Sequence, residues 1–130
     1  MNFEPLDSSY NELTGKIVDA AFQVHSSLGP GLLESVYEKC LIIELQEKKL
    51  RVATQVNLPI IYKNKNVDTN LRIDILVEDK VIVELKSVEQ MLPVFEAQLL
   101  TYLKLSGKRV GLLINFNVSI IKKGIKRIIL

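Results

Sequence analysis

Residues that commonly bind transition metals or form disulfides are scarce in this sequence. It contains one histidine, His25, and one cysteine, Cys40, among 130 residues. A single histidine excludes a metal site built on a histidine pair and argues against a histidine-based catalytic triad, so His25 is interpreted as a structural residue. A single cysteine excludes an internal disulfide and a cysteine-rich metal site, and the apolar surroundings of Cys40 predict a small core residue.

Two further absences narrow the class of protein. The apolar runs are short and broken by charges, and segment 1–7 has no basic region followed by an apolar one. We therefore expect neither a transmembrane helix nor a signal peptide, and we predict a cytoplasmic location. The sequence has no glycine-rich phosphate loop of the P-loop type, so nucleotide-driven activity is not indicated.

The residues that are present suffice for one compact domain. The chain is 48% hydrophobic and shows no internal repeat, so we predict a tail at 1–10 and a single domain at 11–130 with its own core. The net charge of +2 is too small to indicate nucleic-acid binding by itself. Cationic residues nevertheless gather in two segments. These segments form either a positive edge that contacts a phosphate backbone or an ordinary solvated surface. The cationic residues are Lys104, Lys108, Arg109, Lys122, Lys123, Lys126 and Arg127.

Hydrophobic periodicity predicts an α+β fold in the order ααβββαββ, a mixed sheet with helices packed against it. Gly29 to Gly31 and Gly107 end two of the predicted helices, and Pro93 fits the start of the third. Pro59 indicates that the first strand lies at a sheet edge or carries a bulge. The expected helices span 11–28, 32–49 and 93–105, the strands 52–62, 67–77, 80–86, 109–116 and 125–130, and a hairpin turn 64–66.

Two carboxylates and a lysine are predicted to converge on neighbouring strands. Side chains alternate between the two faces of a strand, so Glu84 and Lys86 point the same way. If segment 71–77 pairs antiparallel to this strand through a turn at 78–80, Asp74 comes near Glu84. A carboxylate within an apolar strand costs free energy when it is buried without a partner, so Asp74 is an unusual residue for a purely structural strand.

These residue types suit phosphodiester hydrolysis with a hard divalent cation. Magnesium prefers oxygen ligands, which Asp74 and Glu84 would supply, and the ion would activate the attacking water. Lys86 would orient that water or accept its proton, and the sequence does not choose between the two roles. Gln98 and Tyr102 lie one helical turn apart and face the same side, where they would contact the lysine, the water or a phosphate.

The same residues carry a resemblance to a known family. Asp74, Glu84-x-Lys86 and Gln98-x-x-x-Tyr102 in this order resemble the PD-(D/E)xK superfamily of restriction-endonuclease-like phosphodiesterases, although Ile73 replaces the proline of that motif. Segment 31–37, Gly-Leu-Leu-Glu-Ser-Val-Tyr, resembles the signature of the bacterial GxxExxY proteins within it.

The resemblance implies a restriction-endonuclease-like core, Mg²⁺ or Mn²⁺ as cofactor, and two further groups at the metal. These are the backbone carbonyl of Leu85 and the carboxylate of Glu34, which would bind the ion directly, through a water or at a second ion. Tyr37 shares a helix face with Glu34 and is expected to hold that carboxylate. The resemblance also leaves open that His25 reaches the mouth of the site.

Two functions of different classes follow. The first is a Mg²⁺-dependent nuclease, with DNA favoured over RNA as substrate. The second is a non-catalytic module on the same fold that binds nucleic acid or a protein. Hydrolysis of another phosphate ester is a weaker third, because the charge pattern indicates no small enclosed pocket. A domain of this size has no room for a separate recognition domain, so sequence specificity would need a homodimer or a protein partner.

Overall fold

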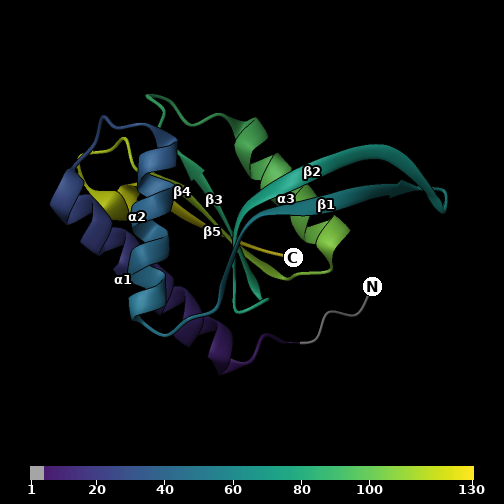
Figure 1. Cartoon of the computed structure of the whole chain (residues 1–130), viewed down its shortest axis with the longest axis horizontal. Helices are drawn as coiled ribbons and strands as arrows, with labels where there is room; N and C mark the ends of the chain where they lie inside the picture. Colours follow the sequence, from purple (N-terminus) through teal and green to yellow (C-terminus); the bar gives the residue numbers. More distant parts are fainter. Residues whose placement is uncertain (1–4) are drawn as a thin grey trace.

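The structure is a computed structural model that describes residues 5–130. Residues 1–4 of the predicted tail lie outside the described residues. The chain forms three α-helices, a five-stranded sheet and one 3₁₀ helix within that range (Figure 1). The bounds are α1 Ser8–Leu28, α2 Glu34–Glu47, β1 Val52–Tyr62, β2 Lys65–Val77, β3 Val81–Lys86, α3 Pro93–Ser106, β4 Val110–Asn115, η1 Ile121–Gly124 and β5 Ile125–Ile129. The predicted α+β class and element order are confirmed.

The sheet is mixed, with the strand order β1-β2-β3-β4-β5. Neighbouring strands are antiparallel except β3 and β4, which are parallel and are joined through α3. Parallel neighbours need a crossover connection, and α3 supplies it. β4 is buried at every position, as expected for an interior strand. β1 lies at one edge and its register shifts between Pro59 and Ile61, so both predictions from Pro59 hold.

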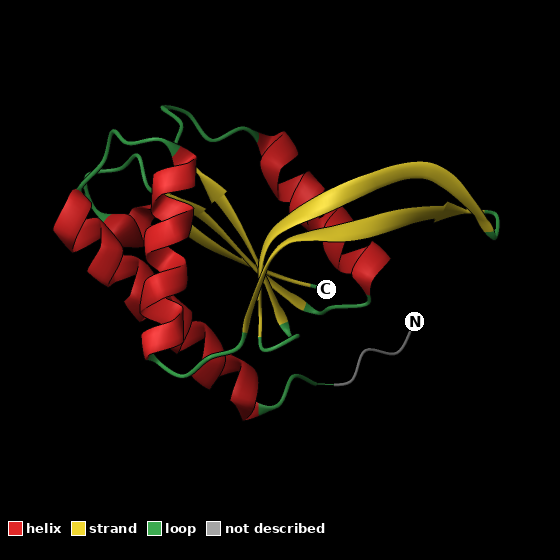
Figure 2. Cartoon of the chain, viewed as in Figure 1, coloured by secondary structure: helices red, strands yellow, loops and turns green. Residues whose placement is uncertain are grey.

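Helices cover both faces of the sheet (Figure 2). α1 and α2 pack on one face, where Ile17, Tyr37 and Leu41 join the odd-numbered residues of β3, from Val81 to Leu85, in a large apolar cluster. α3 packs on the other face through a smaller cluster that contains Leu99, Tyr102 and Leu103. The even-numbered positions of β3, which include Glu84 and Lys86, therefore belong to the α3 side.

Several predicted boundaries were wrong by a few residues. α1 begins at Ser8 rather than 11, because Asp7 caps it by accepting a hydrogen bond from the Ser9 backbone N–H at 2.9 Å. The hairpin turn lies at Lys63 and Asn64 rather than 64–66, since these two residues have φ of 50° and 63°, as a tight hairpin turn requires. η1 was not predicted. None of the helices within 5–130 is both long and apolar enough to cross a membrane.

Candidate active site

The candidate site lies where β2 separates from β3. The two strands pair only from Val77↔Val81 to Ile75↔Val83. At the next position the Asp74 backbone N–H donates to Glu84 Oε1 at 3.2 Å, and the Leu85 backbone N–H donates to Asp74 Oδ2 at 2.9 Å. Each carboxylate thus accepts a hydrogen bond from the other strand at the point of separation. The predicted approach of Asp74 to Glu84 is confirmed.

Glu84 is a buried carboxyl group without a cationic partner. The residue is 7% exposed, and no ion pair of the described residues 5–130 involves it. Burial and the neighbouring Asp74 carboxylate raise the pKa of Glu84 from its ordinary 4.5 to about 9, because both disfavour the charged form. Lys86 acts in the opposite direction but more weakly. An unbalanced pair of carboxyl groups is therefore built into the sheet.

Lys86 and the α3 residues lie on the same face as Glu84. The Lys86 Nζ atom sits 4.4 Å from the centre of the Phe95 ring, a cation–π contact that holds the ammonium group beside α3. Gln98 Nε2 donates to the Tyr102 hydroxyl at 2.9 Å, so the two side chains lie on the same side of α3, as their helical spacing predicted. Burial, and then the charge of Glu84, raise the pKa of Tyr102, which places this phenol within the electrostatic range of the carboxylate.

Glu34 faces Asp74 across a separate small pocket of about 330 Å³. It lies in the first turn of α2, and the pocket is lined by Glu34, Ser35, Glu38, Gln55, Asp74 and Leu85. Partial burial raises the pKa of Glu34, and the Asp74 charge adds to the effect, while Lys86 opposes it. Gln55 Nε2 donates to Glu38 Oε1 at 2.8 Å and so closes one side. Asp74 therefore lines this pocket and also belongs to the pair with Glu84.

Tyr37 holds the loop before Glu34 rather than the Glu34 carboxylate itself. Its hydroxyl donates to the Gly29 carbonyl oxygen at 2.6 Å and accepts from the Leu32 N–H at 3.1 Å, and its ring stacks on Phe116. The expected contact from Tyr37 to Glu34 is therefore replaced by contacts to the loop, because the tyrosine points into the core. Gly29, with φ of 67°, ends α1 as predicted.

Two polar residues that the sequence analysis did not single out support the site. Ser87 Oγ donates to the Leu32 carbonyl oxygen at 2.5 Å, which ties the end of β3 to the loop before α2. Asn115, only 2% exposed, accepts from the Val88 N–H at 3.1 Å and donates to the Val88 carbonyl oxygen at 3.0 Å. Asn115 is the polar last residue of the otherwise apolar strand β4, and this was the available signal for a buried polar residue with such a role.

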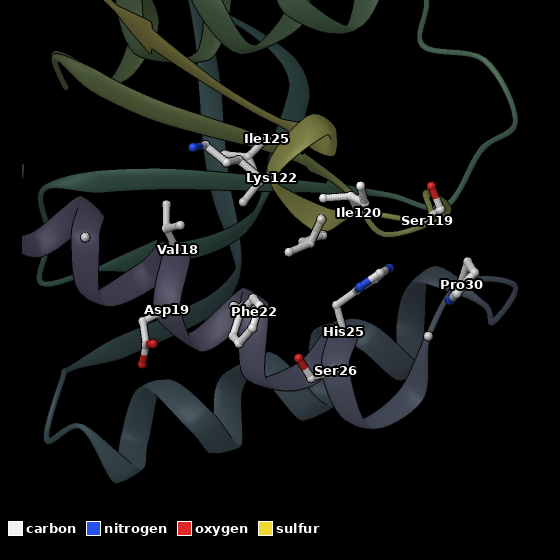
Figure 3. A pocket seen from close by; sticks show the side chains of 13 residues that line it. Val18, Asp19, Phe22, His25, Ser26, Pro30, Ser119, Ile120, Lys122 and Ile125 are labelled. Atoms are coloured by element: carbon white, nitrogen blue, oxygen red, sulfur yellow. The ribbon is translucent and has the colours of Figure 1, made fainter.

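His25 lies away from the carboxylates. Its Nε2 atom is 2.7 Å from the Val118 carbonyl oxygen, a hydrogen bond that ties α1 to the segment before η1. His25 lines a larger, mostly apolar cavity of about 890 Å³ between α1 and η1, together with residues such as Phe22 and Ile120 (Figure 3). None of the residues lining this cavity lines the pocket of Glu34 and Asp74. The structural interpretation of His25 fits these contacts.

The ligand atoms of the acidic pair are of the type that a hard divalent cation prefers. Asp74 and Glu84 offer oxygen ligands only, and a cation between them would supply the positive charge that buried Glu84 lacks. Within residues 5–130, however, no three or more histidine, cysteine, aspartate or glutamate side chains are placed to hold one ion. Glu34 is therefore a neighbour of the Asp74–Glu84 pair and does not complete a three-carboxylate group.

The five-stranded mixed sheet flanked by helices is consistent with a restriction-endonuclease-like fold. A family model described as the PD-(D/E)XK nuclease superfamily matches residues 11–128, and the chain belongs to that superfamily. Comparisons with curated proteins and with solved structures gave no match. Nuclease-type proteins of this superfamily generally use divalent metals and act on nucleic acid. The narrower GxxExxY relationship stays a prediction.

Proposed function

We propose that this protein is a Mg²⁺-dependent nuclease that hydrolyses phosphodiester bonds of DNA. The observation that supports this most strongly is the Asp74–Glu84 pair, in which a buried carboxyl group lies against a second carboxylate without a cation. A purely structural pair of this kind lowers stability, because neither acid offsets the charge of the other. A site that binds a divalent cation gives the pair a function.

Asp74 and Glu84, with the backbone carbonyl of Leu85, would hold the ion, and Glu34 would act from the pocket that it shares with Asp74. A bound divalent ion supplies a Lewis acid for phosphate oxygens and makes a nearby water more acidic. The Leu85 N–H fixes the Asp74 carboxylate in place by donating to it at 2.9 Å. Its orientation is therefore set by the backbone before any substrate arrives.

Lys86 supplies the positive charge of the proposed site. Because it lies on the same strand face as Glu84, its ammonium group is positioned to orient water and to offset charge that develops on a phosphate. Phe95 limits the movement of that group. The Gln98–Tyr102 pair offers an amide and a phenol on the same side for contacts with Lys86, water or phosphate. Lys86 would either orient the water or accept its proton, and both alternatives stay open.

A non-catalytic binding module is the alternative, and one observation favours it. No group of three acidic ligands is formed within the part of the chain that the structure describes. In that case the acidic pair would be a remnant, and the fold would bind nucleic acid or a protein partner without turnover. This function predicts binding that does not depend on metal and does not change in Lys86→Met.

Cleavage assays separate the two functions. Labelled duplex DNA, single-stranded DNA and RNA are incubated with Mg²⁺ or Mn²⁺ and with the wild type, Asp74→Asn or Lys86→Met. The exposed Glu89→Gln change serves as the matched control. We expect cleavage by the wild type and Glu89→Gln only, with a preference for DNA. Cleavage by Asp74→Asn and Lys86→Met at the wild-type rate would contradict the nuclease proposal.

A further inference from the structure

The β1–β2 hairpin extends well beyond the candidate site. Only Ile75 to Val77 of β2 pair with β3, while β1 and β2 pair with each other as far as Tyr62↔Lys65. The base of the hairpin is anchored, because Leu58 and Ile73 are buried in the cluster with Tyr102. Every residue from 61 to 70 is exposed, and Figure 1 shows this part of the hairpin extending away from the rest of the molecule.

The free part of the hairpin has a defined, bent shape. We call residues 59–70 the hairpin tip. A tight turn at Lys63 and Asn64 closes it, Asp68 has φ of 55°, and the strand register shifts between Pro59 and Ile61. Irregularities of this kind bend and twist a two-stranded ribbon, and they protect an exposed edge from pairing with other strands. The tip therefore presents a two-stranded ribbon rather than an unstructured loop.

The side chains of the hairpin tip combine unpaired positive charge with exposed apolar surface. Lys63 lies in the turn and Lys65 directly follows it. Neither forms an ion pair within residues 5–130, although Lys63 Nζ lies 5.7 Å from the centre of the Tyr62 ring. Tyr62 is 64% exposed. Elsewhere, Lys108 and Lys126 are neutralised by acidic partners at 3.1 and 2.7 Å. The tip thus keeps cations available for an external anion.

We propose that the hairpin tip is an arm that contacts duplex DNA on one side of the cleavage site, with Lys63 and Lys65 on its phosphates. This inference rests on the proposed nuclease function. The major groove admits a two-stranded β-ribbon, and the combination of lysines with an exposed tyrosine suits phosphates and base edges. The arm would give this domain itself a way to hold a duplex.

The length of the arm agrees with this placement. β2 runs about nine residues from Asp74 to Lys65, which at about 3.3 Å per residue reaches about 30 Å at most. One turn of DNA is about 34 Å long. The tip would therefore contact the duplex within about one turn of the bond at Asp74. A second protein copy is a poorer occupant, because tips that meet would bring like-charged Lys63 and Lys65 together.

The test is duplex binding by a hairpin tip without its two lysines, which changes the formal charge of residues 59–70 from +1 to −1 because Asp68 remains. Fluorescence anisotropy with a labelled 30-base-pair duplex in EDTA compares the wild type with Lys63→Gln/Lys65→Gln over a series of salt concentrations. The matched control is Lys39→Gln/Lys49→Gln, which removes the same charge from two exposed residues in and just after α2. If each hairpin lysine neutralises one phosphate, the slope of log K against log salt falls by about 1.8 in magnitude, and affinity at 0.15 M salt falls by about 30-fold. The control keeps the wild-type slope.

The outcomes separate this inference from the proposed function. Wild-type cleavage of DNA together with unchanged binding by the hairpin variant would overturn the inference and leave the nuclease intact. No DNA binding or cleavage by the wild type would overturn both. Sedimentation of the wild type and Ile61→Ser completes the test: a dimer that this exposed-residue change converts to a monomer would make the tip a protein interface and overturn the inference. Equal mass for both proteins supports it.

Discussion

Replacing Glu84 by glutamine is expected to stabilise the metal-free protein. The carboxyl group has a pKa of about 9 in the folded chain, against an ordinary 4.5, owing to burial and to Asp74. Between these two values the unfolded chain releases the proton that the folded chain keeps. The free energy of unfolding therefore falls as pH rises from about 4.5 to about 9. At pH 7 this loss is about 3 kcal/mol, at about 1.4 kcal/mol for each pH unit above 4.5.

Glu84→Gln removes the proton equilibrium while keeping nearly the same shape. We expect the variant to exceed the wild type by about 3 kcal/mol at pH 7 in EDTA and to match it near pH 4.5. Urea denaturation at pH 4.5, 7 and 8.5 measures this difference. Mg²⁺ at 100 times its dissociation constant should raise the wild-type stability by about 2.7 kcal/mol and leave the variant unchanged. The exposed Glu89→Gln serves as control, with changes within about 0.5 kcal/mol.

One result would refute this reasoning directly. If Glu84→Gln is less stable than the wild type by the same amount at all three pH values, Glu84 acts through a hydrogen bond or packing. The buried charge would then carry no pH-dependent cost. The same conclusion would follow if the free energy of unfolding of the wild type changed between pH 4.5 and 8.5 by no more than that of Glu84→Gln.

Three further predictions concern the site and its support. Lys86→Met should keep Mg²⁺ binding and lower the cleavage rate by at least about 100-fold, measured by single-turnover assays; a rate within twofold of the wild type would contradict the role of Lys86. Tyr37→Phe should lower the free energy of unfolding by about 1–3 kcal/mol in urea denaturation, because the Leu32 N–H loses its acceptor; no change would show that water replaces the hydroxyl. Gly124→Ala should lower the melting temperature, since an added Cβ would lie 2.2 Å from the Asn115 carbonyl oxygen. Gly15→Ala lies inside α1, where an added Cβ would meet no atom within 4 Å, and it should raise the free energy of unfolding by about 1 kcal/mol. The opposite order of stabilities would contradict both placements.

The strands and their alternation were predictable from the sequence because they depend on local patterns. Glu84 and Lys86 are two apart on one strand, and a short turn joins it to the strand of Asp74, so their approach required only pairing and period-two geometry. The shared side of Gln98 and Tyr102 was predictable for an equally local reason, because residues four apart lie on one face of a helix.

The support of the site was not predictable, because it depends on contacts between distant segments. The loop before Glu34 is held by the hydroxyl of Tyr37 and by Ser87, which lies 55 residues away from Leu32. The helical face shared by Tyr37 and Glu34 suggested a direct contact, but core packing against Phe116 directs the ring elsewhere. The separation of β2 from β3, which lets the carboxylates accept backbone hydrogen bonds, is also a tertiary feature.

The central claim is that Asp74 and Glu84 together bind a divalent cation, and calorimetry tests it most directly. Mn²⁺ is titrated into the wild type, Asp74→Asn and the pocket control Glu38→Gln at pH 7, in two buffers that differ in ionisation enthalpy. Because Glu84 has a pKa of about 9, binding to its carboxylate should release about one proton per ion. We expect this proton release in the wild type and Glu38→Gln and no binding in Asp74→Asn. Binding that releases no proton, or that survives unchanged in Asp74→Asn, would contradict the central claim.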